Sequence, residues 1–283
     1  MQTKVTSLNT RGVLRIGGED ALHFLNNLVT CDIEKVSAER ATFGALLTPQ
    51  GKILWDFFIH TAPEHSFYLE APKDELAALQ KRLTFYKLRA KVTIDDVSET
   101  VFVAASWDGP LPEGFVPDPR LNSLGGRAVL PVATTLPLEK TVLSTPQAWH
   151  QHRLSLGVPE SMADFALGDT FPHDADMDSL NGVAFEKGCY VGQEVVSRMK
   201  HRGTARKRIV VVQGTSSLPE SGTEVTASGK VLGVMGSSEG DHGLALLRLD
   251  RVKQAIDAGE PILAGDVALE VTIPDWAGFD WPS

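Results

Sequence analysis

The densest cluster of chemically capable side chains is the segment Lys187-Gly188-Cys189-Tyr190-Val191-Gly192-Gln193-Glu194. Cys189 stands beside a lysine here, and nearby positive charge favours the thiolate, the form that attacks electrophiles and binds metals. The residues from Gly192 to Gly203 predict a short helix with an acid in its first turn. Its dipole supplies only about 0.3–1 kcal/mol, against about 1.36 kcal/mol per pKa unit. We therefore expect Lys187 to assist Cys189.

Simpler interpretations of the same residues stay open. Cys189 could be an inert buried thiol, and Glu194 could serve only the helix dipole. The bases that follow could be ordinary solvated helix surface. A structure decides between these interpretations by the exposure of each side chain.

Charge is unevenly distributed around this segment. The chain has 283 residues and a formal net charge of −9, which does not favour whole-chain attraction to nucleic acid or anionic lipid. Residues 160–186 nevertheless hold seven acids and no Lys or Arg, whereas residues 187–208 hold seven bases and one acid. We call the bases of this second window the basic strip: Lys187, Arg198, Lys200, Arg202, Arg206, Lys207 and Arg208.

Other motif matches predict structure rather than chemistry. Residues 236–240 fit G-x-S-x-G, but a nucleophile elbow needs a strand leading into a helix, and here the pattern predicts a hairpin turn. His150 and His152 have metal-ligand spacing without a third ligand. The aromatic residues Trp55, Phe57, Phe58 and Phe67 fit a hydrophobic core or the wall of a cavity for a flat heterocycle.

The elements that must position these residues alternate between helix and strand in the first part of the chain. Apolar spacing predicts helices over 21–29 and 73–86, and strands over 43–47, 53–60 and 67–70. Further strands are expected over 91–94 and 101–104, then a proline-rich stretch, then a helix from Pro146 to about Gly157.

The pattern of predicted secondary structure changes after Gly203. Short β-rich runs separated by Gly, Ser and Pro predict a small barrel or sandwich. We therefore predict an α+β protein with a region over 1–203, two subdomains meeting near 105–140, and a C-terminal β-barrel over 204–283.

Composition restricts the compartment and the metal chemistry. The two cysteines, Cys31 and Cys189, are far apart in sequence, so one chain cannot build a zinc ribbon or a cluster cage, and we expect no tightly bound metal. Free cysteines fit a reducing compartment, and no apolar run reaches the length of a membrane span. We predict a cytoplasmic protein without a membrane partner.

These motifs together resemble the YgfZ-type folate-binding family, whose mitochondrial counterparts serve in iron–sulfur cluster assembly. The signature K-G-C-Y-x-G-Q-E is complete at 187–194 and continues to Gly203. Three further segments resemble family landmarks in the expected order, so that the resemblance spans about the whole chain: 24–32, 47–52 and 153–159.

The resemblance implies a fold shared with the aminomethyltransferase of glycine cleavage, a ring of α+β subdomains with a C-terminal β-barrel. It implies tetrahydrofolate or a derivative as cofactor, and iron–sulfur client or carrier proteins as partners. Cys189 would be the functional thiol. The transferase carries two adjacent acids where this chain has Trp55 and Asp56, so glycine-cleavage activity is not expected. A one-carbon transferase that uses Asp56 stays open, as does a tRNA contact through the basic strip in tRNA modification.

Folate chemistry suggests how this sequence would hold such a ligand. The pterin presents two neighbouring donors that one carboxylate can accept, and Glu194 or Asp56 could provide it. The basic strip or Arg153 would receive the carboxylates of the tail. The expected folate-binding residues are Lys187, Tyr190, Gln193, Glu194, Arg198, Arg202 and Arg153.

Overall fold

The computed structural model describes residues 2–203 and 205–282. The chain forms two compact units, each built from several segments. Unit 1 comprises the residues up to 49 together with 54–149 and 181–193, and unit 2 comprises 50–53, 150–180 and the residues from 194 onward.

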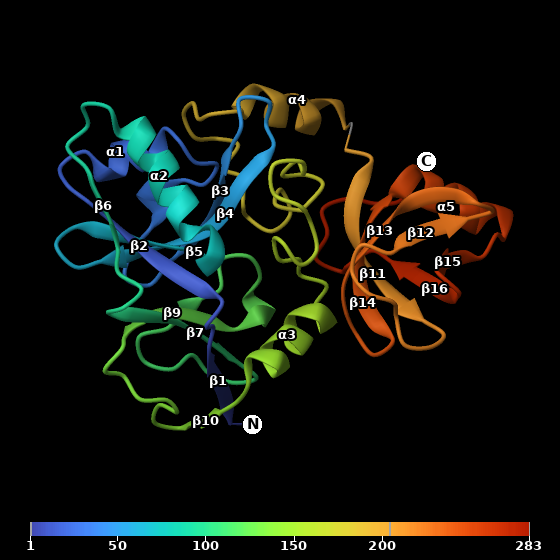
Figure 1. Ribbon diagram of the computed structural model, residues 1–283, viewed down its shortest axis with the longest axis horizontal. Helices are drawn as coiled ribbons and strands as arrows, with labels where there is room; N and C mark the ends of the chain where they lie inside the picture. Colours follow the sequence, from blue (N-terminus) through green and yellow to red (C-terminus); the bar gives the residue numbers. More distant parts are fainter. Residues whose placement is uncertain (1, 204, 283) are drawn as a thin grey trace. The chain divides into compact units, whose positions relative to one another are not determined.

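The first sheet of unit 1 has five strands, and helices α1 and α2 belong to the same part of the chain (Figure 1). Strand β2 pairs antiparallel with both β5 and β6, with Leu14 opposite Leu69 and Ile16 opposite Ile94. In sheet order the strands are β3 (Thr42–Leu47), β4 (Ile53–Ala62), β5 (Ser66–Pro72), β2 (Arg11–Gly17) and β6 (Thr93–Asp96). The helices are α1 (Ala21–Asn26), η1 (Ile33–Lys35), η2 (Lys73–Glu75) and α2 (Leu76–Lys87).

A second sheet of unit 1 joins the first strand of the chain to later ones. Strand β1 (Thr3–Ser7) pairs antiparallel with β7 and parallel with β10, so the chain changes sheet after β1 and again before β7. Its core contains Val5, Ala104 and Leu130. The order is β10 (Thr141–Leu143), β1, β7 (Val101–Trp107), β9 (Gly126–Pro131) and β8 (Val116–Pro117), with η3 (Asn122–Leu124) beside them.

Unit 2 contains a closed six-stranded barrel. Strand β11 pairs antiparallel with β14 and β16, and alternating side chains such as Val210 and Val212 point into the core. Around the barrel the order is β11 (Lys207–Gly214), β14 (His242–Arg248), β13 (Lys230–Glu239), β12 (Glu224–Ala227), β15 (Ile262–Ala264) and β16 (Val267–Thr272).

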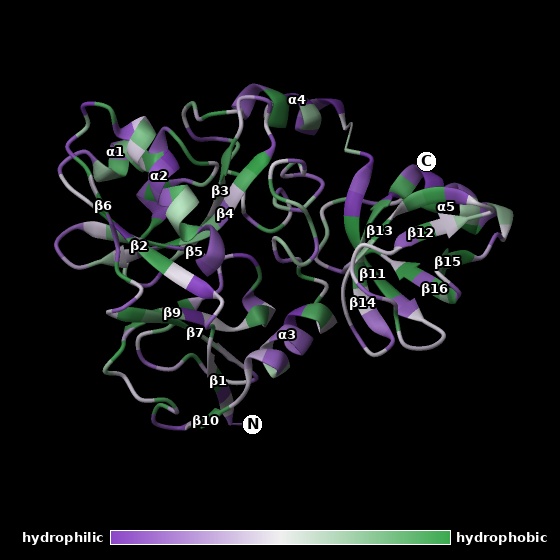
Figure 2. Cartoon of the chain, viewed as in Figure 1, coloured by the Kyte–Doolittle hydropathy of each residue, from purple (hydrophilic) through white to green (hydrophobic). Residues whose placement is uncertain are grey.

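Three helices complete the chain. Helices α3 (Pro146–Ser155) and α4 (Gln193–Arg202) each begin at the end of a unit 1 segment. Helix α5 (Leu249–Ala258) follows β14 and ends at Gly259, whose left-handed backbone suits glycine. In Figure 2, β9 is mainly hydrophobic and α4 mainly hydrophilic, as expected for a buried strand and a solvent-facing helix.

The predicted elements are confirmed with small shifts of their ends, and the predicted barrel is present. Of the G-x-S-x-G residues, 236–239 end β13 and Gly240 lies in the turn to β14, which confirms the hairpin. The aromatic residues predicted for the core, including Trp55 and Phe57, are buried. Helix α5 and strand β15 were not predicted, because the stretch between β14 and β16 was assigned to no element. The other strands that were not predicted are β1, β2, β8, β9 and β10.

Candidate functional site

Cys189 is exposed and lies four residues before α4. The helix begins at Gln193 and carries Glu194 in its first turn, as predicted. An inert buried thiol is therefore the wrong interpretation of Cys189. Its sulfur can be reached by a partner or by a metal.

The ammonium of Lys187 is held by main-chain oxygens rather than by Cys189. Its Nζ donates to the carbonyl of Val29 at 2.9 Å and to that of Cys31 at 2.6 Å, and lies 5.6 Å from the ring centroid of Tyr190. Burial lowers the pKa of Lys187. Lys187 therefore links the segment around Cys189 to the loop after α1. Among the described contacts, none joins the ammonium of Lys187 to the sulfur of Cys189, so the predicted assistance is not seen as a direct contact.

Thr30 makes a second tie between the same two segments. Its hydroxyl donates to the carbonyl of Gly182 at 2.6 Å and accepts from the amide of Ala45 at 2.8 Å. The amide of Ala184 donates to the carbonyl of Thr30 at 2.8 Å. The segment leading to Cys189 is thus fixed to both the α1 loop and β3.

Tyr190 and the residues of α4 differ in exposure. Tyr190 is buried, its hydroxyl has no hydrogen-bond partner among the described residues, and burial raises its pKa to about 12. Gln193 is half-buried, whereas Glu194, Arg198 and Arg202 are exposed. The exposed residues of α4 can meet a ligand or a partner only at the surface.

Unit 1 contains a cavity of about 470 Å³ beside these ties. Its buried wall includes Cys31, Thr42 and Phe43, and its rim includes Lys35 and Arg40. Its volume is that of a site for a drug-sized ligand. The remaining lining residues are Asp32, Glu39, Ala41, Pro117, Asp118, Pro119, Asn122, Asn181, Val183 and Ala184.

Cys31 is the less reactive of the two cysteines. It is 2% exposed, and burial raises its pKa to about 11, so the thiol stays protonated at neutral pH. Thr42 donates to its sulfur at 3.7 Å. A Cβ at position 44 would lie 2.5 Å from that sulfur, so Gly44 is required for the packing. Cys189 is therefore the candidate reactive thiol.

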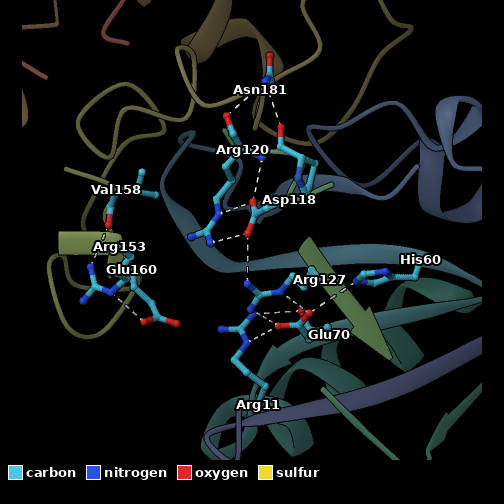
Figure 3. A network of polar contacts seen from close by, with 11 residues as sticks. Arg11, His60, Glu70, Asp118, Arg120, Arg127, Arg153, Val158, Glu160 and Asn181 are labelled. Atoms are coloured by element: carbon cyan, nitrogen blue, oxygen red, sulfur yellow. Dashed lines mark hydrogen bonds and ion pairs between the residues drawn. The ribbon is translucent and has the colours of Figure 1, made fainter. Parts of the chain in front are cut away.

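A buried network of charges adjoins the cavity through Asp118 (Figure 3). Glu70 accepts from Arg127 at 2.6 and 2.8 Å and from Arg11 at 2.7 Å. Asp118 accepts from the Arg120 side chain at 2.9 and 3.0 Å and from Arg127 at 3.4 Å. All five residues are at most 7% exposed.

Both carboxyls of this network are ionised. Burial alone would raise the pKa of Glu70, but Arg127 and Arg11 hold it well below its usual range. Arg120 and Arg127 outweigh burial in the same way at Asp118 and lower its pKa. This network was not predicted from the sequence, although charged residues inside apolar strands are a visible signal of buried pairs.

Asp56 is buried on β4 and is not among the residues that line the cavity. The indole of its neighbour Trp55 donates to Glu75 at 2.8 Å. Trp55 therefore has a structural bond where the transferase pattern has an acid. The structure does not bring Asp56 and Cys189 into contact in the described part of the chain.

Arg153, in unit 2, is occupied by protein groups. Its side chain is 1% exposed and donates to Asp164 at 2.7 Å, to the carbonyl of Val158 at 2.9 Å and to Ser237 at 2.7 Å. The guanidinium of Arg153 is therefore buried and already bonded to protein groups. The structure does not support the expectation that it binds the carboxylates of a folate tail. We leave Arg153 out of the candidate site.

The acids of residues 160–186 also serve internal partners. Asp178 accepts from Arg208 at 2.6 and 3.0 Å, and Asp169 accepts from Lys52. The basic strip offers fewer exposed cations than the sequence suggests, because Arg208 is buried and Lys187 donates to main-chain carbonyls. Its exposed members are Arg198, Lys200, Arg202, Arg206 and Lys207.

Asp176, also in unit 2, predicts a specific pH dependence of stability. It is fully buried, and Arg208 lies 3.5 Å away. Burial raises its pKa well above the usual range. A raised folded-state pKa gives stability that is full below the unfolded value near pH 4 and is lost as pH rises through the folded value. Asp176→Asn should therefore gain melting temperature relative to the parent as pH rises from about 4 to 8.

The control for this prediction is Asp178→Asn. This change removes the negative charge that Arg208 pairs with and one of the two oxygens that accept from it, so it should lower the melting temperature. A difference between Asp176→Asn and the parent that is constant across this pH range would contradict the assignment to Asp176.

Within the described residues, no group of three or more His, Cys, Asp or Glu side chains could hold a metal ion. No helix of this described part is long and apolar enough to cross a membrane.

Two known family domains match different parts of this chain, one near its N-terminal end and one over the barrel. Residues 2–111 match the GCVT N-terminal domain, and residues 206–279 match the CAF17 C-terminal β-barrel domain. The aminomethyltransferase T of the Bartonella henselae glycine cleavage system superposes with a TM-score of 0.74 over 96% of this chain and 85% of that one, at 15% identity. This chain therefore has the aminomethyltransferase-like fold with mixed helices and strands and a closed barrel.

Several relatives align along nearly the whole chain. The mitochondrial iron–sulfur cluster assembly factor IBA57 of Homo sapiens is 33% identical, over 98% of this chain and 85% of its own length, and the Mus musculus protein gives the same figures. The Mycosarcoma maydis homologue is 29% identical over 99% of this chain and 85% of its own.

The names of these relatives contradict the predicted cytoplasmic location, because they are mitochondrial proteins. The prediction was wrong because it rested on two free cysteines and the lack of an apolar span. Both features are common to reducing compartments in general and do not distinguish one from another.

Proposed function

This chain belongs to the family of the iron–sulfur cluster assembly factor IBA57, and from that membership we propose that it acts in assembly or repair of iron–sulfur clusters in client proteins. The observation that carries the proposal is the exposure of Cys189, within a segment that Lys187 and Thr30 fix in place. Cys189 supplies one thiolate to a cluster, and the thiol proton is released on binding. The other ligands come from a partner, since one thiolate cannot hold a cluster.

The test is complementation of a strain that lacks its own factor of this family. The chain should restore the activity of iron–sulfur enzymes in that strain and leave enzymes without clusters unchanged. Unrestored iron–sulfur activity, with the protein present at normal level, would contradict the proposal.

The proposal includes tetrahydrofolate or a derivative as a ligand of the unit 1 cavity. The cavity fits the ligand in volume, since about 470 Å³ lies within the range of such sites. Phe43 offers a flat wall for a ring, and Lys35 and Arg40 offer positive charge to the tail carboxylates. Bound tetrahydrofolate would supply a reduced pterin able to carry one-carbon units.

Donors and acceptors for the pterin are present in the same lining. The side-chain nitrogen of Asn181 donates to the carbonyl of Pro119 at 3.0 Å, which fixes the orientation of its amide. Asp118 is already held by arginines. Of the other lining carboxylates, Asp32 accepts from the amide of Glu34 at 3.1 Å and Glu39 accepts from Ser37 at 2.9 Å. Each carboxylate has further lone pairs that can accept from the pterin donors. Cys31 adds a neutral thiol to the wall.

The charge of the rim gives a testable prediction. Lys35→Glu combined with Arg40→Glu should weaken tetrahydrofolate binding about tenfold, because the rim then repels the tail. Binding of a tetrahydropterin that lacks the glutamyl tail should change little. Calorimetric titration measures both affinities.

Lys73→Glu, an exposed lysine of unit 1 outside the cavity lining, is the matched control and should bind as the parent does. Equal affinity of the parent and the rim variant for tetrahydrofolate would remove Lys35 and Arg40 from the site.

A further inference from the structure

The outward face of α2 combines exposed apolar side chains with cations. Phe85 is 72% exposed and Leu88 is 87% exposed, the highest values among large hydrophobic residues of the described chain. The opposite face of the helix buries Leu76, Leu79 and Leu83. The exposed residues are therefore not needed for the core.

Lys81 and Arg82 lie four and three residues before Phe85 on α2, so these three side chains are neighbours on one face of the helix. The helix ends at Lys87, and Leu88, whose φ is 45°, follows directly after it with Arg89. Both of these residues are exposed. We call this group the α2 patch: Lys81, Arg82, Phe85, Leu88 and Arg89.

The positive charge of the α2 patch is not neutralised by the protein. Residues 81–94 contain five Lys or Arg and no acid. Lys91 pairs with Glu19 at 2.6 Å, but the three cations of the patch have no ion-pair partner among the residues that the structure describes. This surplus stands out in a chain of net charge −9.

We propose that the α2 patch is a docking surface for an acidic segment of a partner protein, in which carboxylates flank apolar side chains. Aromatic side chains and arginines are the residues that most often dominate binding energy at protein interfaces. Phe85 would pack against the apolar side chains of the segment, with Leu88 beside it. Arg82 and its neighbours would meet the flanking carboxylates and set the orientation. The α2 patch shares no residue with the cavity lining, so this inference stands apart from folate binding.

The observations favour an acidic protein over other occupants. A second copy of this chain, docked patch to patch, would oppose cations to cations. Nucleic acid presents no apolar surface that would cover both Phe85 and Leu88, and only Phe85 has a ring to stack on bases. Two apolar side chains bury too little area to anchor a protein in lipid.

The experiment measures binding of a fluorescent synthetic peptide in which glutamates flank a leucine and a tryptophan. The full chain should bind this peptide, with affinity that falls as salt rises. Phe85→Ala with Leu88→Ser should weaken binding about tenfold or more, and Arg82→Glu should weaken it similarly and reduce the salt dependence. Melting temperatures should match the parent, because these side chains lie at the surface.

Leu143→Ala and Lys230→Glu are the matched controls, an exposed apolar residue and an exposed cation elsewhere, and both should bind as the parent does. A uridine homopolymer RNA and vesicles of phosphatidylglycerol with phosphatidylcholine are the competing probes. Absent peptide binding, equal losses in the controls, or tighter binding of RNA or vesicles would each overturn the proposal.

Discussion

Glu70→Gln is expected to destabilise the protein by about 3–5 kcal/mol, the usual cost of removing one partner of a buried ion pair. Glu70 is fully buried and neutralises two guanidiniums, Arg127 and Arg11. The glutamine amide keeps the volume but loses the charge and turns a donor toward other donors. Denaturant unfolding of the parent and the variant measures the difference.

The control is Glu64→Gln, which removes the partner of Arg15 in a surface pair and should change stability little. Acid provides a second readout. Because the pKa of Glu70 is depressed, its stabilising contribution is present above the unfolded value near pH 4 and is lost as pH falls toward the folded value. The difference in the free energy of unfolding between the parent and Glu70→Gln should therefore become smaller as the pH falls. A difference that becomes larger would contradict the conclusion that ionised Glu70 stabilises the fold.

Cys189→Ala is expected to abolish iron–sulfur enzyme activity in the complemented strain. The sulfur is exposed and is the proposed cluster ligand, so its loss removes the chemistry without disturbing the core. Melting temperature and tetrahydrofolate affinity should stay at the parental values. Activity of two cluster-dependent enzymes, measured with the level of the assembly protein, gives the result.

Cys31→Ala makes the same change at the buried cysteine and is the matched control. It should lower stability modestly, through the lost contacts beside Gly44, and retain activity. Full activity in Cys189→Ala would exclude this thiol from the function. Equal loss in both variants would assign the effect to folding.

Local patterns predicted most of the fold. Helical spacing located α2, which buries one face, and short β-rich runs located strands of the barrel. A continuous apolar run next to a Pro/Gly turn located β4, which is buried along most of its length. The pairing of β1 with β10, 138 residues later at Thr3 and Thr141, had no local signal. The division into two interleaved units is equally a property of contacts between distant segments.

The site was predictable in part for the same reason. The spacing around Cys189 predicted a thiol just before a helix, and the structure confirms this position. Its exposure was left open by the sequence and comes from the structure. The cavity is lined by residues from three distant segments, 31–43, 117–122 and 181–184. Local sequence patterns do not show that these segments meet, so the cavity could not be predicted from them. Arg153 was misread because a buried arginine and a ligand-binding arginine look alike until their partners are known.

The most direct test of the central claim is a crystal structure of the chain with tetrahydrofolate bound. We predict the ligand in the unit 1 cavity, with its ring against Phe43 and its tail carboxylates toward Lys35 and Arg40. A fully occupied ligand elsewhere on the chain, with this cavity filled only by water, would contradict the account.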